Sequence, residues 1–392
     1  MRQIWIEEGC ALNGDAIKIL RLKYPTGGWF PGLRALSWRI TSHNLPYADL
    51  TFSPHLKKVF IYPWWGRHDS GEANFPPAVF SIISSLLVSR LRSLIVDIQN
   101  QETYDLISWE DLEDPFSSVM LHCGALLQHF SSVVPMSDEA ILHLINLPHL
   151  RIFHVKGPPP PFSTSLSLPA LKGCAFGEGA ANGWVSLLKS LERSAPTGQS
   201  ITPLFRMKES LRQLKIQDRD GLVIDGPFTS LVQVFRNLAY LNVDVYCSSW
   251  VSGDQCGFQA NNNDVTGLAA ALPQLTVLTL GHPCSSNTCA TTVACLLPIS
   301  VHCAKLEKLE VHFNTTNITA DFESVFQDPK FQDLRKLPRS PLQLLNVHKT
   351  PLTLKQPDRP AVVTGLAYAF PSLMHVKGDW GVWDELSEVL NL

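Results

Sequence analysis

Thiols and imidazoles gather in one stretch of the chain, and these groups are the usual ligands of zinc. They are Cys284, Cys289, Cys295, Cys303, His282, His302 and His312. A structural zinc site needs closely paired ligands such as Cys-x-x-Cys, whereas the gaps here follow no zinc pattern. A free cysteine on or beside an apolar helix acts as a small core side chain. The sequence therefore predicts no metal ion at this place.

A glycine-rich loop and a set of hydrolase-type residues are the other candidates for chemistry. The loop Gly177–Gly183 follows a predicted strand, but its third glycine falls one residue late for a dinucleotide fingerprint, and the chain has no phosphate loop ending in Gly-Lys-Ser/Thr. His68, Asp69 and Ser70 are adjacent, whereas the members of a catalytic triad converge from distant segments. We therefore predict no enzymatic activity and no cofactor.

Composition and charge narrow the classes of partner. The 392 residues are 45% hydrophobic and 17% charged, which is typical of a globular protein. The 32 Lys and Arg residues face 35 Asp and Glu residues, and this balance gives no basic excess for nucleic acid or an anionic membrane. No apolar run approaches ~18 residues, the length that a membrane helix needs. We expect neither nucleic acid nor a membrane as partner.

Cysteine usage and the first residues bear on the compartment. The nine cysteines follow no disulfide framework, which favours a reducing environment. Met1–Pro25 lacks the basic start and apolar segment of a signal peptide. The sequence therefore predicts an intracellular protein, cytoplasmic or nuclear.

One short phrase recurs along the chain. It consists of Leu, two variable residues, an apolar residue, one variable residue and another apolar residue, and its copies lie at 30–40, 53–63, 89–98, 147–157, 168–178, 209–218, 235–245, 272–282, 303–313, 340–350 and 370–380. Because the last two apolar residues alternate with variable ones, the phrase predicts a short strand with one buried face. Such a strand cannot bury its face alone, so the copies must stack.

Amphipathic stretches between the phrases predict helices. They cover 78–88, 138–147, 264–272, 291–303 and 362–370, and Ser137 is placed to cap the second of them. The later phrases lie about thirty to forty residues apart, which exceeds the ~20–29 residues of regular leucine-rich repeats and indicates long loops. A degenerate unit near Val119–Leu127 would fill the double step between Leu91 and Leu150. The usual asparagine after the strand is mostly missing, so the backbone must turn there by other means.

These elements predict an α/β fold: an irregular leucine-rich-repeat solenoid (horseshoe) with parallel strands on one face and helices on the other. We expect residues 30–392 to form this domain and residues 1–29 to form an N-terminal unit or the remnant of a truncated N-terminal region.

Loops between the elements offer candidate contacts. Trp64, Trp65 and Arg67 follow a strand directly, so they could lie at the rim of the binding face and anchor a partner. The alternative is that the two tryptophans pack under their own loop. Pro158–Pro161 is interpreted as a rigid connector, with a ligand for an aromatic groove as the alternative. Gly253–Asn263 is expected to be a flexible loop.

The phrases also resemble a known family. FPGLRALSWRI, YADLTFSPHLKKVFIYP, NNNDVTGLAAALPQLTVLTLGH and HCAKLEKLEVHF are similar to the leucine-rich region of F-box-like proteins of basidiomycete fungi, from about Phe30 to the C-terminus. The resemblance implies a substrate receptor of a cullin-based ubiquitin ligase, in which the repeats hold the target. The family's F-box motif is not found in Met1–Pro25, so we expect an adaptor subunit to bind only if an F-box lies upstream. A stand-alone structural repeat protein is the alternative, and an enzyme with a site hidden in loops is a third.

Overall fold

The structure is a computed structural model of the chain. It describes residues 3–6, 22–23, 30–40, 53, 55–63, 75–87, 90–97, 109–124, 126–156, 171–177, 209–218, 224–245, 258–281, 289–327, 339–348, 359–378 and 381–390. The chain divides into two compact units, Met1–Gly173 and Cys174–Leu392. Each unit is described by itself below.

Short parallel strands pair in chain order in the first unit. They are β1 (Gln3–Ile6), β2 (Ala35–Ile40), β3 (Lys58–Pro63), β4 (Ser93–Val96), β5 (His129–Ser132) and β6 (Ile152–Val155). Equivalent residues of the phrase lie side by side, so that Leu36 is paired with Val59 and Val59 with Leu94. A strand order that follows the chain is what stacked repeats require.

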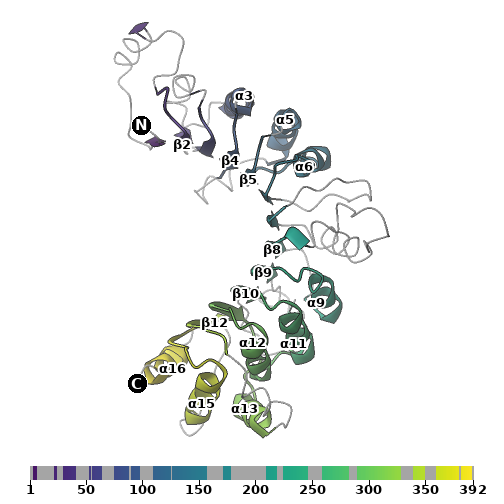
Figure 1. Ribbon diagram of the computed structural model, residues 1–392, viewed down its shortest axis with the longest axis vertical. Coiled ribbons are helices and arrows are strands. Elements are labelled where there is room, and N and C mark those ends of the chain that lie inside the picture. Colours follow the sequence, from purple (N-terminus) through teal and green to yellow (C-terminus); the bar gives the residue numbers. More distant parts are fainter. Residues whose placement is uncertain are drawn as a thin grey trace. The chain divides into compact units, whose positions relative to one another are not determined.

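Helices of the first unit lie on one side of its strands (Figure 1). They are α3 (Phe75–Leu87), α5 (Trp109–Leu121) and α6 (Asp138–Ile145). Ser137 caps α6 as predicted, because its hydroxyl accepts a hydrogen bond from the amide of Ala140 at 3.4 Å. Neighbouring helices pack through their buried side chains, as the rings of Phe80 and Phe116 do at 5.4 Å between centroids.

Strands of the second unit follow the same rule. After β7 (Gly173–Phe176), which spans the boundary, they are β8 (Gln213–Asp218), β9 (Tyr240–Val245), β10 (Val277–Leu280), β11 (Lys308–Val311), β12 (Leu344–His348) and β13 (His375–Gly378). The helices are α9 (Gly226–Val232), α11 (Asn262–Ala271), α12 (Leu296–His302) after a 3-10 turn at Val293–Cys295, α13 (Ile318–Gln327), α15 (Arg359–Ala369) and α16 (Gly381–Leu390).

The three apolar residues of each phrase form the core. In β10 and its approach, Leu275, Leu278 and Leu280 are at most 1% exposed, and the same positions are buried in the neighbouring phrases. Parallel strands in chain order, each with an inward apolar face and most followed by a helix, confirm the predicted α/β leucine-rich-repeat solenoid.

Two local predictions need correction. A degenerate unit does fill the step between Leu91 and Leu150, but its phrase begins only at Leu127, the last residue of the predicted range, because α5 continues to Leu121 and the strand β5 follows Leu127. The phrase is hidden there because Ser132 replaces the last apolar residue; the serine is buried, and its hydroxyl accepts from the amide of Val134 at 3.0 Å. Gly253–Asn263 is also not loop throughout. Phe258 is buried and forms a β-bridge with Ile224, and Asn261 caps α11.

A glycine takes over the turn after β10, where the repeat consensus would have asparagine. Gly281 has a φ of +91°, a left-handed conformation that costs glycine little and strains residues with a Cβ. Its amide donates to the carbonyl of Val243 at 3.0 Å, so the turn stays attached to the preceding strand.

Helix α16 packs against β13 and covers the free backbone edge of that strand. The Ser387 hydroxyl accepts from the amide of Val376 at 2.7 Å and donates to its carbonyl at 2.8 Å. Trp383, fully buried, meets the ring of Phe313 edge-on at 6.1 Å. A Cβ on Gly378 would lie 2.5 Å from Cδ1 of Trp383, so only glycine permits this close packing.

Candidate interaction surfaces

The outward positions of the strands form continuous rows across the second unit. The register places Thr279 between Asn242 and Glu310. Following the same register through β8, β12 and β13 gives a row of mostly polar side chains: Lys215, Asn242, Thr279, Glu310, Asn346 and Lys377. Because one repeat contributes one side chain to the row, the spacing between them is that of strands in a sheet, ~4.8 Å.

Glu310 is the centre of this row. Its carboxylate accepts a hydrogen bond from Thr279 Oγ1 at 3.1 Å and from Asn346 Nδ2 at 3.2 Å, and it pairs with Lys308 Nζ at 2.7 Å. The Glu310 side chain is 14% exposed, whereas that of Lys308 is 44% exposed. Three neighbours on three strands therefore hold one carboxylate at the surface of the sheet.

The electrostatics of Glu310 favour its charged form. Burial raises the pKa of this carboxyl, but the hydrogen bonds from Lys308, Asn346 and Thr279 and the positive charge of Lys308 outweigh burial, so that its pKa lies below the ordinary value. At neutral pH the group is an ionised acceptor held in a fixed position. Such a group suits a cationic or amide-bearing side chain of a partner.

Asn242 adds an acceptor beside this cluster. Its amide nitrogen donates to the hydroxyl of Tyr240 at 3.3 Å. Within the described residues, its Oδ1 is buried and has no hydrogen-bond partner. An unsatisfied buried acceptor is costly, and a partner's donor reaches this one only when the side chains that cover it move aside.

The strand face of the first unit has a different character. Its outward rows are dominated by apolar, aromatic and small side chains: Ala35, Ser37, Lys58, Phe60, Ser93, Ile95, His129, Ser131, Ile152 and His154. His129 and His154 meet edge to face at 6.2 Å between ring centroids. Burial, together with the positive charge of Lys58, lowers the pKa of His129 and favours its neutral imidazole.

The residues predicted from sequence as a rim, Trp64, Trp65 and Arg67, lie outside the described residues, and their role stays a prediction. His68–Ser70 and Pro158–Pro161 also lie outside the described residues, so the interpretations given to them stay predictions. No sequence argument pointed to Glu310 or its neighbours. The signal was present, because aligning the phrases by register brings their variable positions into one row.

The cysteines of the described region are buried. Burial raises the pKa of Cys295 and of Cys303 to about 12, so both thiols stay protonated. The thiol of Cys303 donates to the carbonyl of Ala269 at 3.6 Å. Among the described residues, no group of three His, Cys, Asp or Glu side chains could hold a metal ion.

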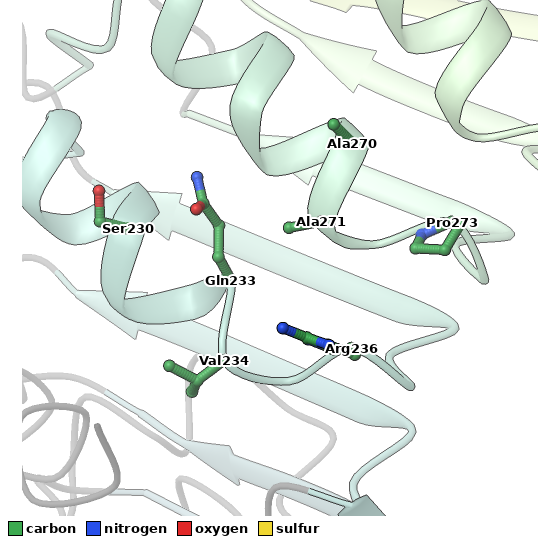
Figure 2. A pocket seen from close by; sticks show the side chains of 7 residues that line it. All are labelled: Ser230, Gln233, Val234, Arg236, Ala270, Ala271 and Pro273. Atoms are coloured by element: carbon green, nitrogen blue, oxygen red, sulfur yellow. The ribbon is translucent and has the colours of Figure 1, made fainter. Parts of the chain in front are cut away.

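A pocket of about 570 Å³ lies between α9 and α11. Figure 2 shows its lining: Ser230, Gln233, Val234, Arg236, Ala270, Ala271 and Pro273. The hydroxyl of Ser230 donates a hydrogen bond to the carbonyl of Gly226 at 2.9 Å. The other polar groups are one amide and one guanidinium, and the lining offers no carboxylate, imidazole or thiol. Acid–base or nucleophilic chemistry therefore has no residues here that could perform it.

Within the described part of the chain, no helix is long and apolar enough to cross a membrane. No protein-family model matches the sequence. No curated protein matches it either. The chain is similar in structure to a chain in the crystal structure of the Rad7 and Elc1 complex in yeast, at 13% identity and a TM-score of 0.42 over 83% of this chain and 72% of that chain.

Proposed function

We propose that the chain is a non-catalytic scaffold for protein–protein interaction and that its strand faces hold the partner. One observation carries the proposal: the carboxylate of Glu310 is fixed by Thr279, Asn346 and Lys308 at the surface of the sheet of the second unit. Holding a polar group in position before binding lowers the entropic cost of association. A surface of this kind recognises a partner without supplying reactive groups.

The finer part of the proposal follows from the resemblance to F-box-like proteins. We propose that the repeats are the substrate-recognition part of such a protein and that they deliver the bound target to a ubiquitin ligase. The alternative is a stand-alone structural repeat protein with no ligase role. Both place the partner on the strand faces, so they differ only in which other proteins accompany the target.

Affinity capture with paired variants tests the binding face. Glu310→Gln keeps the shape of the side chain and removes its charge. Glu323→Gln makes the same change on an exposed position of α13, on the helical side. A hydrogen bond to a charged group contributes about 1.5–3 kcal/mol, so recovery of a specific partner should fall about tenfold or more with Glu310→Gln and stay unchanged with Glu323→Gln. Equal recovery with both variants would place the partner elsewhere.

The composition of the captured material separates the two alternatives. Cullin and adaptor subunits that are recovered together with the target, in fixed proportion, would support the ligase role. A target that is recovered repeatedly without those subunits would favour the stand-alone scaffold.

A further inference from the structure

A column of cationic side chains runs along the edge of the first unit where its strands begin. The residue that follows the first leucine of each phrase supplies the column: Arg34, Lys57, Arg92, Gln128, Arg151 and Lys172. The five cationic members are exposed, and only Gln128 is half-buried. From this column we infer that the first unit binds an acidic segment of a partner protein, an inference that rests on the proposed scaffold function.

Backbone hydrogen bonds fix the order and spacing of the column. The amide of Lys57 donates to the carbonyl of Arg34 at 2.8 Å, and the amide of Arg92 donates to the carbonyl of Lys57 at 2.8 Å. The same bond joins Gln128 to Arg92, Arg151 to Gln128 and Lys172 to Arg151. Successive members are therefore one strand apart, and the whole column spans roughly 24 Å.

The repeat itself does not require cationic residues at this position. In the second unit the equivalent residues are Arg212, Ala239, Thr276, Glu307, Gln343 and Met374. They occupy the same backbone position, since the amide of Ala239 donates to the carbonyl of Arg212 and that of Thr276 to Ala239. The second unit folds with a mixed set, so the cationic column of the first unit has a cause other than folding.

No partner within the described part of the chain neutralises the column. Among the described residues, none of its five cations makes an ion pair with a carboxylate. Lys58, in the next row, adds a further exposed cation, and its charge helps to lower the pKa of His129. Like charges at this spacing repel one another, and an anionic ligand would relieve the repulsion.

The side chains beside the column define the rest of the ligand. The two adjacent outward rows contain Phe60, Ile95 and Ile152, which are half-buried, and no carboxylate. A fitting ligand thus carries negative charges along one edge and apolar groups along the other. An acidic protein segment with interspersed apolar residues meets both requirements, and the arginines can hold its carboxylates in bidentate geometry.

A nucleic acid fits these observations less well. The chain has a net charge of −3, whereas domains that bind nucleic acid carry a basic excess. Carboxylates of the same unit lie on α5 and α6: Asp111, Glu113, Asp114, Asp138 and Glu139. Their field opposes a long polyanion more than a short acidic segment that stays on the column. Ile95 and Ile152 are aliphatic, so of the three apolar side chains beside the column only Phe60 has a ring on which a base can stack, whereas a bound single strand stacks base after base.

Peptide selection on the full chain tests the inference. The probe is a library of random peptides of about ten residues, which in extended form can span the column. The selected peptides should be enriched in Asp and Glu with apolar residues between them. Their affinity should fall as salt is raised, and it should be lost when Glu and Asp are replaced by Gln and Asn. Selection without acidic enrichment would overturn the inference.

A charge-reversed variant locates the binding. Arg92→Glu combined with Arg151→Glu should weaken the selected peptides by at least about tenfold. Arg212→Glu combined with Lys377→Glu is the matched control, because it likewise reverses two exposed cations but in the second unit. An equal effect of the double variant and the control would exclude the column. Circular dichroism of each variant verifies that it folds.

Three further outcomes are decisive. A short single-stranded oligonucleotide that binds more tightly than the peptides, and that the double variant no longer binds, would replace the acidic protein segment by nucleic acid. A partner whose capture depends on Glu310 but not on Arg92 and Arg151 would leave the proposed scaffold function intact and refute the cationic column. Conversely, acidic peptides that bind the column while no protein partner is captured would support the column and refute the scaffold function.

Discussion

Leu278 is the middle residue of a buried triplet, and its side chain is 0% exposed between neighbouring repeats. Replacing a fully buried leucine by alanine removes apolar contact and leaves a cavity that the core fills incompletely. We expect Leu278→Ala to lower the free energy of unfolding by about 2–5 kcal/mol in chemical denaturation. Val277→Ala, at the outward half-buried neighbour, should cost less than about 1 kcal/mol. Equal costs would mean that β10 does not face a core.

Glu310 should make stability depend on pH in the acidic range. Because its pKa is lower in the folded chain than in the unfolded chain, the unfolded state binds more protons as pH falls, and the stabilisation present at neutral pH is lost. We expect the free energy of unfolding of the wild type to exceed that of Glu310→Gln by about 1 kcal/mol at neutral pH. This difference should vanish as the pH drops through the pKa that Glu310 has in the folded chain.

Denaturation curves of wild type and Glu310→Gln over a pH series measure this difference. Glu323→Gln reports the general effect of losing one carboxylate on the helical side. A constant difference between wild type and Glu310→Gln at every pH would show that the cluster does not stabilise the charged form.

Surface residues were harder to predict from the sequence than core residues. Inward positions such as Leu278 are recognisable because burial demands an apolar side chain at a fixed spacing. Outward positions such as Glu310 and Asn346 have no such constraint, and their meaning emerges only when the register brings three strands together. The cations Arg92 and Arg151 also stand out only when equivalent positions are compared.

The helix α11 shows how an element can begin inside a stretch that looks like a loop. Asn261 accepts from the amides of Asn263 and Asp264, and the Asp264 carboxylate accepts from the amide of Asn261. This reciprocal pair is a capping box. We expect Asn261→Ala to destabilise the second unit by about 0.5–2 kcal/mol.

Thermal or chemical unfolding of Asn261→Ala measures the loss. Asn263→Ala is the control, because Asn263 is exposed and contributes its backbone amide but no side-chain bond to the box. A loss of the same size in the control would point to helix propensity and not to capping.

The strands were predicted better than the helices, for physical reasons. Each of the phrases recognised in the sequence contains a strand, because stacking imposes the same apolar spacing on every copy. The phrase that contains strand β5 was not recognised, because its last inward position is Ser132 and not an apolar residue. The buried Ser132 hydroxyl is satisfied by hydrogen bonds with the backbone of Val134. Helix α5 contains Pro115 in its interior, which is ordinarily a signal against a helix. Helices α9, α13 and α16 were not predicted either.

At the scale of the whole molecule, the two units are built from the same kind of repeat but present different surfaces. The first unit offers cations beside apolar side chains, and the second offers a fixed carboxylate among amides and hydroxyls. The prediction of residues 30–392 as one domain with residues 1–29 separate stays a prediction. The structure adds that β1 lies within that N-terminal part and pairs in register with β2.

Ser387 is expected to matter for association between molecules as well as for stability. Ser387→Ala would leave the amide and carbonyl of Val376 without this partner on the side of β13 that faces α16. We expect a loss of about 1–3 kcal/mol in unfolding free energy and an increased tendency to self-associate, measured by light scattering. Ser324→Ala, on the exposed face of α13, should change neither quantity. Unchanged association in Ser387→Ala would mean that packing of Trp383 protects the edge by itself.

The packing of α16 against β13 also limits where a solenoid of this kind can gain or lose repeats. Because Ser387 occupies the backbone edge and Trp383 fills the space beside Gly378, another repeat cannot stack directly on β13 while the helix stays in place. Repeats can be duplicated or deleted between existing repeats, where each new strand finds the same neighbours on both sides. Lengthening at β13 would require the helix to move with the new outermost strand, so gain and loss of repeats should be concentrated in the interior.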